Sequence, residues 1–251
     1  MGTSTSSRGP NNSSPLVPPW ADVDGRGTGP TPPPNRFQGF RTALGKFVRT
    51  GNQSYMRSAL RSYASTSTGG SAVGARRFGA MVQAGGGLYE ALDQLRRDPA
   101  NAPVDLQRLV GKSTREVIDA LVDWLVPENG DADRIRTALN DSLSECLDGA
   151  DEFDFGSLTD DVLMDIMITY VSNCVFEQIM LDSNRAFAKA QTPEQAETAE
   201  HALSELVTVV TEKHMTPLIE REIRTMSNAD MQAAQIAAIK DVWREWEDYQ
   251  P

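Results

Sequence analysis

Residues 158–180 are LTDDVLMDIMITYVSNCVFEQIM, and their apolar side chains return every three or four positions, the spacing of one face of an α-helix. A helix with so broad an apolar face is expected in a protein core. The stretch therefore predicts a long core helix in an all-α protein. The face consists of Leu158, Val162, Leu163, Ile166, Met167, Tyr170, Val171, Cys174 and Val175.

Helix signals also flank this core helix. Residues 192–195, Thr-Pro-Glu-Gln, supply an N-cap and a proline at the first helical position, and the helix they open should be kinked or split at Pro217. Residues 113–116, Ser-Thr-Arg-Glu, form a capping box for a helix that ends before Pro127. No stretch alternates polar and apolar residues convincingly, as a β-strand does. The body should therefore resemble a helical bundle.

Residues 36–97 are basic and rich in Gly and Ala. Apolar residues at three- and four-residue steps predict two short amphipathic helices there, separated by Gly51. A third helix should run from about Gly70 to Leu95, interrupted or loosened at the glycines of residues 85–87. Residues 98–251 are acidic and are expected to form a helical domain, with an internal break near residues 149–156.

The first 35 residues are dominated by Gly, Ser, Thr, Asn and Pro. Such a composition has too few apolar side chains to offset the entropy lost on folding, so residues 1–35 are predicted to be a long disordered tail. An apolar island containing Leu16, Val17 and Trp20 interrupts this tail. Such an island either docks on a partner protein or packs back on the chain's own domain.

The formal net charge of −11 is divided unevenly along the chain. Residues 1–112 contain 14 basic and 6 acidic residues, a net charge of +8, whereas residues 113–251 contain 10 basic and 29 acidic residues, a net charge of −19. The basic part should contact an acidic surface, which is the chain's own acidic half, a partner protein or nucleic acid. A nucleic-acid-binding subunit would use Arg41, Arg49, Arg57, Arg61, Arg76 and Arg77.

Cysteine usage and hydropathy favour a cytoplasmic location. Cys146 and Cys174 lie in predicted helices without a C-x-x-C partner, so both should be free thiols. The N-terminus has no apolar signal region, and no run of about 18 apolar residues occurs, so neither export nor a membrane span is indicated.

No pattern predicts an active site, a metal or a cofactor. His201 and His214 have no partner at a metal-ligand spacing. Residues 111–114, Gly-Lys-Ser-Thr, resemble the end of a phosphate-binding P-loop, but Leu106 stands where that motif needs its first glycine. We therefore expect a protein without catalytic residues.

A glycine turn is the candidate phosphate or nucleic-acid contact. Gly70 and Ser71 would open a helix with free backbone N–H groups, and Arg76 and Arg77 would add charge and bidentate donors. The alternative is an ordinary helix start followed by surface arginines.

The first residues, MGTSTS, offer a chemical group of their own. Gly2 is small enough to permit removal of Met1, which would expose an α-amine with a pKa of about 7.7 to 8, a usable nucleophile near neutral pH. The same residues fit the N-myristoylation pattern. The alternative is a solvated start to the tail.

Residues 1–10 and 15–20 are similar to the opening of QatB proteins, a family of the bacterial Qat anti-phage defence system. The resemblance continues to about residue 90 through Gly51, Met56, Arg57, residues 69–71 and residues 75–79. It implies a non-enzymatic protein in a system with a QueC-like enzyme, an ATPase and a TatD-like nuclease.

The resemblance also implies a reaction at the tail, in which the QueC-like enzyme joins a deazaguanine base to the amine of Gly2. A second hypothesis is a scaffold that bridges the ATPase and the other components, with the tail as a docking motif. The nucleic-acid-binding subunit is the third. The tail residues expected to contact the enzyme are Thr3, Ser4, Thr5, Ser6, Leu16, Val17 and Trp20.

Overall fold

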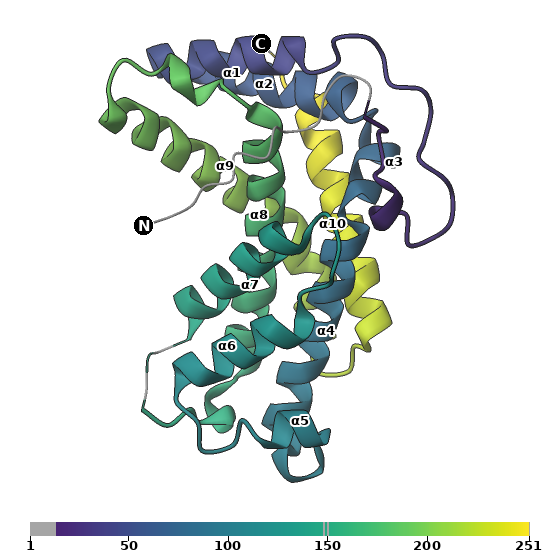
Figure 1. Cartoon of the computed structure of the whole chain (residues 1–251), viewed down its shortest axis with the longest axis vertical. Helices are drawn as coiled ribbons and strands as arrows, with labels where there is room; N and C mark the ends of the chain where they lie inside the picture. Colours follow the sequence, from purple (N-terminus) through teal and green to yellow (C-terminus); the bar gives the residue numbers. More distant parts are fainter. Residues whose placement is uncertain (1–13, 148, 150, 251) are drawn as a thin grey trace. The chain divides into compact units, whose positions relative to one another are not determined.

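The computed structural model describes residues 14–147, 149 and 151–250, which form helices joined by turns and loops, with no β-strand among them (Figure 1). The all-α prediction is confirmed. Unit 1 comprises, within the described chain, residues 14–77, 176–206 and 240–250, and unit 2 comprises residues 78–147, 149, 151–175 and 207–239. Each of these two compact units gathers segments that are far apart in the sequence.

Each unit has helices of its own, and three long helices contribute residues to both. Those of unit 1 are η1 (Pro19–Ala21), α1 (Gln38–Thr50), α2 (Gln53–Ser62), the π-helix η2 (Tyr63–Ser67), α3 (Ser71–Gly74) and η6 (Phe187–Lys189). Those of unit 2 are α4 (Gly79–Arg97), η4 (Pro99–Asn101), α5 (Val104–Gln107), α6 (Thr114–Leu125), α7 (Ala132–Cys146) and η5 (Phe155–Ser157). The short η3 (Ala75–Phe78) joins α3 to α4, and the shared helices are α8 (Asp160–Ser183), α9 (Pro193–Ile219) and α10 (Asn228–Glu247).

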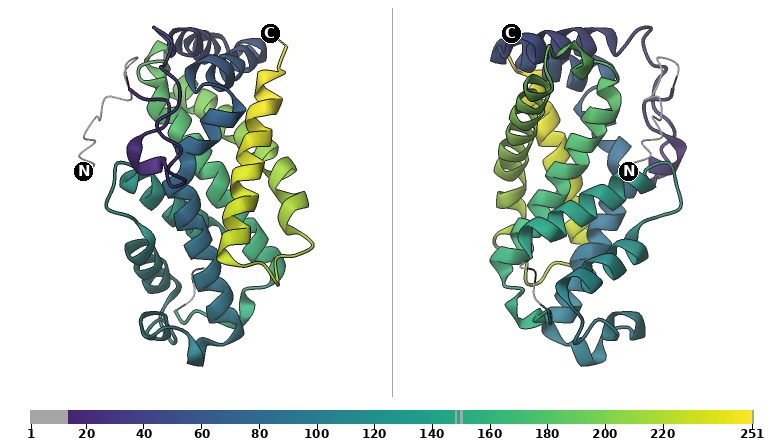
Figure 2. Two further views of the ribbon diagram at one scale, coloured as in Figure 1. Left: turned by 90° about the vertical axis from the view of Figure 1, so that its right-hand side faces the viewer. Right: turned by 60° about the vertical axis from the view of Figure 1, so that its left-hand side comes forward.

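In unit 1, α1 and α2 lie side by side in all three ribbon views (Figures 1 and 2). Gly51 ends α1 in the left-handed conformation, with φ 68°, and its N–H donates to the carbonyl of Phe47. Asn52 then caps α2 by accepting a hydrogen bond from the Ser54 N–H. The two amphipathic helices and their break at Gly51 are as predicted.

In unit 2, the capping box at Ser113 and Glu116 forms and opens α6 as predicted. The expected interruption of α4 at residues 85–87 does not occur, since α4 continues unbroken to Arg97. A Cβ atom at Gly85 would lie only 2.7 Å from Cε1 of the buried Tyr170. These glycines therefore allow neighbouring side chains to pack closely against α4. The free energy gained from this packing offsets the low helix propensity of glycine.

The long core helix is confirmed as α8. It is the one described helix long and apolar enough to cross a membrane, but 56% of its most apolar window is buried inside the protein, as in a core helix. Pro217 lies inside α9, only two residues before the helix ends at Ile219, so it does not split the helix midway.

Candidate functional site

The residues with the most specific predicted chemistry, Gly2 and Thr3 to Ser6, lie outside the described residues. The described part of the predicted tail begins at Ser14. Its placement decides what the apolar island does.

The apolar island divides into a buried part and an exposed part. The side chains of Leu16 and Val17 belong to the core, whereas Trp20 is 45% exposed. The Val17 N–H donates to the carbonyl of Thr28 at 3.1 Å, which closes a loop. Leu16 and Val17 therefore pack back on unit 1, one of the two uses that the sequence left open, and Trp20 keeps a large accessible apolar surface.

Asp22 holds the loop that follows the island. Its carboxylate accepts hydrogen bonds from the backbone N–H groups of Arg26, at 3.0 Å, and Gly27, at 2.7 Å, and from the guanidinium of Arg76, at 2.7 Å. Burial raises the pKa of Asp22, but these hydrogen bonds outweigh it and leave the pKa below its ordinary value. The apolar contacts of Leu16 and Val17 and the ionic contacts of Asp22 thus hold this part of the chain on unit 1.

The predicted phosphate contact is satisfied within the chain. At the turn of Gly70 and Ser71, the Ser71 N–H donates to the carboxylate of Glu247 at 2.9 Å, so an acidic side chain occupies the place of a phosphate. Arg76 is paired with Asp22, and Arg77 is paired with Asp182. This arrangement favours the structural alternative for all four residues.

Unit 1 also contains a buried ion cluster, centred on Asp182. Asp182, whose side chain is fully buried, pairs with Arg77 at 2.9 Å and accepts a hydrogen bond from the Tyr63 hydroxyl at 2.8 Å. Its backbone carbonyl accepts a hydrogen bond from Nε of Arg41 at 2.8 Å. Arginines of the basic part of the sequence thus contact an acidic residue of the other part, as the self-contact hypothesis expects.

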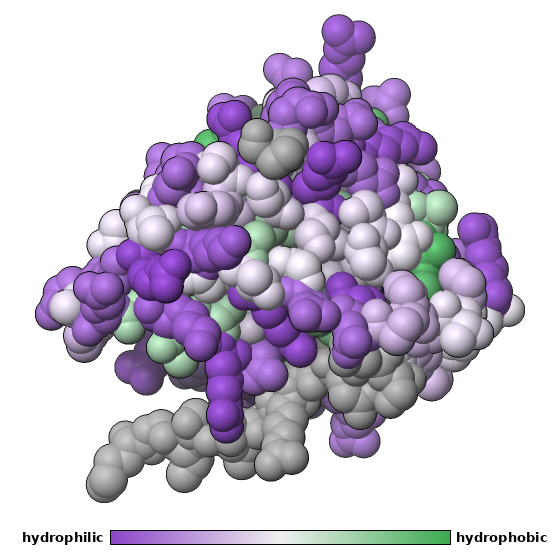
Figure 3. All heavy atoms as spheres, turned by 90° about the horizontal axis from the view of Figure 1, so that it is seen from above, coloured by the Kyte–Doolittle hydropathy of each residue, from purple (hydrophilic) through white to green (hydrophobic). Residues whose placement is uncertain are grey.

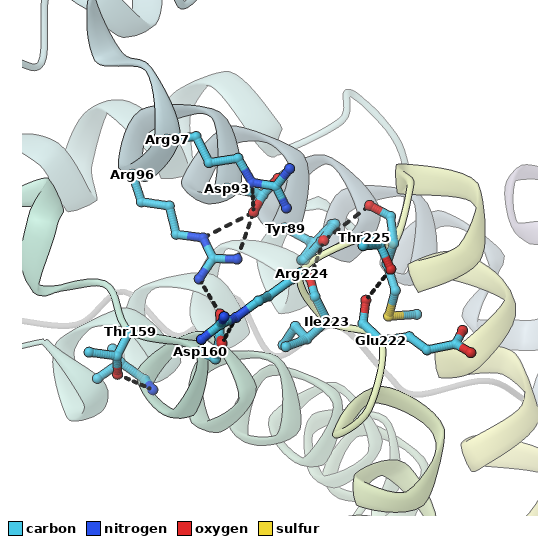
Figure 4. Close-up of polar contacts among 12 residues, drawn as sticks. Tyr89, Asp93, Arg96, Arg97, Thr159, Asp160, Glu222, Ile223, Arg224 and Thr225 are labelled. Atoms are coloured by element: carbon cyan, nitrogen blue, oxygen red, sulfur yellow. Dashed lines mark hydrogen bonds and ion pairs between the residues drawn. The ribbon is translucent and has the colours of Figure 1, made fainter.

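Unit 2 contains a second ionic network, drawn in Figure 4. Asp160, in the first turn of α8, lies between Arg96 of α4 and Arg224 of the segment after α9, and pairs with both. Its distance to Arg96 is 2.6 Å, and Arg96 also pairs with Asp93 at 2.8 Å. The hydrogen bonds from Arg96 and then from Arg224 lower the pKa of Asp160.

Beside this network, Tyr89 fastens the chain after α9 onto α4. Its hydroxyl donates to the carbonyl of Ile223, at 2.5 Å (Figure 4), and to that of Met226, at 3.1 Å. Burial raises the pKa of Tyr89 to about 12, so it stays protonated and remains a donor. The side chains of this network act as hydrogen-bond donors and counter-charges that hold α4, the start of α8 and the segment after α9 together. None of these contacts places a nucleophile beside a base.

Replacing Asp160 by Asn should lower the stability at neutral pH, and the loss should shrink as the pH falls. A carboxylate whose pKa is lowered by folding stabilises the fold above its unfolded pKa of about 3.9, and this stabilisation disappears as the pH falls through the folded pKa. Urea unfolding near neutral pH and below a pH of about 3 measures the difference.

The matched control is Asp161→Asn, which removes a charge from the same first turn of α8 but from a side chain with no ion pair among the described residues. An equal loss of stability by Asp160→Asn at both pH values would contradict the assignment.

A family model for the Qat anti-phage system associated protein QatB matches residues 69–245. The chain belongs to the QatB family. Membership makes it a component of the Qat anti-phage system, associated with the other proteins of that system. Comparisons with curated proteins and with solved structures gave no match.

The QatB match begins after the tail and covers the whole ionic network of unit 2 and the Asp182–Arg77 pair of unit 1, but not Arg41 or Tyr63. Asp182, Arg77, Asp160, Arg96 and Arg224 all lie within the matched residues. No spacing pattern marks these residues in the sequence, because Arg96 and Asp160 are separated by 64 positions that only folding brings together. Within the described residues, no group of three or more His, Cys, Asp or Glu side chains could hold a metal ion.

Proposed function

We propose that this chain is a non-enzymatic, cytoplasmic member of the Qat system whose N-terminal tail is bound by a QueC-like partner enzyme. Once Met1 has been removed, the α-amine of Gly2 attacks a deazaguanine base that the enzyme has activated with ATP, and the activating group leaves as the new bond forms. Membership in the QatB family supports a role within the system. The absence of any recognisable catalytic motif in the sequence supports a role as substrate.

The observation that carries the proposal is the anchoring of the chain at Leu16 and Val17, about midway along the tail. Leu16 and Val17 are buried in unit 1, so the residues before Ser14 start from a fixed point on the protein. Twelve residues, from Gly2 to Ser13, span at most about 40 Å when extended. An enzyme bound at the anchor would therefore meet Gly2 at a high effective concentration.

Trp20 is the side chain best placed to hold the enzyme at this anchor. It is 45% exposed beside the buried pair, and large exposed aromatic side chains dominate the binding energy of many interfaces. Leu16 and Val17 then contribute by positioning Trp20 rather than by touching the partner.

Intact-mass measurement after co-expression with the QueC-like partner tests the modification. With the deazaguanine precursor available, the mass should increase by one conjugated base, and fragmentation should place it on Gly2. A variant lacking residues 2–9 is the control and should stay unmodified. An unmodified Gly2 in the presence of active partner would overturn the proposal.

We expect Trp20→Ala to weaken binding of the QueC-like partner by about 30-fold or more, because a central tryptophan typically contributes 2 kcal/mol or more to an interface. Titration calorimetry of the purified proteins gives the affinity. The control is Val23→Ala, a truncation at a site that is 47% exposed, which should change the affinity far less. Equal affinities of the Trp20 variant and the wild type would remove Trp20 from the interface.

The scaffold hypothesis, in which the tail docks on the ATPase or another component, is separated from modification by the variant lacking residues 2–9. Loss of defence with an intact complex supports modification, whereas loss of the complex supports docking. The third hypothesis, nucleic-acid binding, has less support at Arg76 and Arg77, because both pair with carboxylates of the chain itself.

A further inference from the structure

One stretch of the chain has positive charge without any negative charge. Between Asp24 and Glu90 the sequence contains no acidic residue. Helix α1 lies within this stretch, and one side of α1 lines a pocket of about 560 Å³ in unit 1. The opposite wall is formed by residues 183–189, at the end of α8 and in η6.

This cationic pocket is defined by five basic side chains. Arg41, Lys46 and Arg49 come from α1, and Arg185 and Lys189 come from the opposite wall. No Asp or Glu belongs to the lining. Figure 3 views the molecule from above Figure 1, the side on which Figure 1 draws α1 and α2, and many hydrophilic side chains are visible there.

Several of these side chains are held in place by contacts with aromatic rings or by close packing. The Arg41 guanidinium lies 4.7 Å from the centroid of the Phe37 ring, and the Lys46 ammonium lies 5.4 Å from that of Tyr55. A Cβ atom at Gly45 would lie 3.1 Å from Cγ of Lys189, so this glycine makes room for the lysine stem. The pocket is therefore partly preorganised.

The charges in the pocket are unbalanced, unlike those of Arg76 and Arg77 in the same unit. Arg76 and Arg77 have carboxylate partners, but Lys46, Arg49, Arg185 and Lys189 take part in no ion pair within the described part of the chain. Like charges gathered in one pocket repel one another, and an anion with several charges relieves that repulsion. The arrangement thus favours a multiply charged anionic ligand.

We propose that the cationic pocket binds the polyphosphate chain of a nucleotide. Arginine forms bidentate hydrogen bonds with phosphate oxygens, and lysine adds a mobile point charge. A volume of about 560 Å³ lies within the usual range for small-molecule sites. A nucleic-acid strand would instead need basic residues along an extended groove, and the whole-chain charge of −11 opposes its approach.

Titration calorimetry of the full-length protein with ATP, inorganic tripolyphosphate, adenosine and a single-stranded DNA oligonucleotide tests the proposal. ATP and tripolyphosphate should bind, more weakly as salt is raised, and adenosine should not. The double variant Arg49→Gln with Arg185→Gln removes one charge from each wall and should weaken binding about tenfold or more.

The matched control is Arg57→Gln with Arg61→Gln, which removes two exposed arginines from the neighbouring helix α2. It should leave the affinity for ATP unchanged. The proposal fails if ATP and tripolyphosphate do not bind, or if both double variants weaken their binding equally. Preferential binding of the oligonucleotide, reduced by both double variants, would replace it with an extended nucleic-acid surface.

Discussion

Replacing Asp182 by Asn should lower the free energy of unfolding by about 3–5 kcal/mol, because it leaves buried positive charge without its counter-ion. The side chains of Asp182 and Arg77 are 0% and 4% exposed, so water cannot take the place of the carboxylate. Arg36 should increase this loss of stability, because its buried positive charge is also stabilised by the charge of Asp182. Burial, together with the nearby charge of Arg77, lowers the pKa of Arg36 to about 10. The negative charge of Asp182 acts in the opposite direction and stabilises the charged form of Arg36.

Urea unfolding monitored by circular dichroism measures this loss, since the structure is helical in all its described elements. The matched control is Asp241→Asn, which breaks an ion pair with Arg244 whose side chains are 41% and 64% exposed. An exposed pair contributes at most about 1 kcal/mol. If both variants lost the same small amount, the Asp182 cluster would not be a buried counter-ion site.

Replacing Trp243 by Ala should also be severe, with a loss of about 3–5 kcal/mol, because it removes a large, fully buried side chain. The indole packs on Tyr63 and Trp246, with ring centroids 5.9 and 5.1 Å away, and donates a hydrogen bond to the Thr68 hydroxyl at 2.8 Å. Gly74 lies so close that a Cβ atom there would be 2.7 Å from the indole Cδ1, which shows how tightly this side chain is packed.

The control for this prediction is Trp124→Ala in α6, where the same side chain is 52% exposed. Its removal leaves no cavity, so the loss of stability should be well below that of the Trp243 variant. Thermal and urea unfolding of both proteins provide the comparison. Similar losses would mean that Trp243 is less enclosed than its packing indicates.

Local patterns were sufficient to predict many of the helices. The capping box at Ser113, the proline start at residue 193 and the glycine stop at Gly51 act within a few residues of the backbone they satisfy. The apolar period of residues 158–180 likewise predicts α8. These signals are short-range, so they can be recognised without knowing the neighbours in space.

The ionic clusters and the pocket could not be predicted in this way. Asp182 meets Arg77, and Asp160 meets Arg96, only because helices distant in the sequence pack together. The glycine turn at residue 70 shows the same limit. Its local pattern fits a phosphate, but the tertiary structure places Glu247 there instead.

The sequence was enough to establish the helical class, the uneven division of charge and the resemblance of the N-terminal residues to QatB proteins. Only the tertiary structure showed that Leu16 and Val17 are buried while Trp20 is exposed, and which arginines have a carboxylate partner. The physical reason is one of range. Helix propensity and capping depend on adjacent residues, whereas burial and ion pairing depend on side chains that folding brings from elsewhere in the chain.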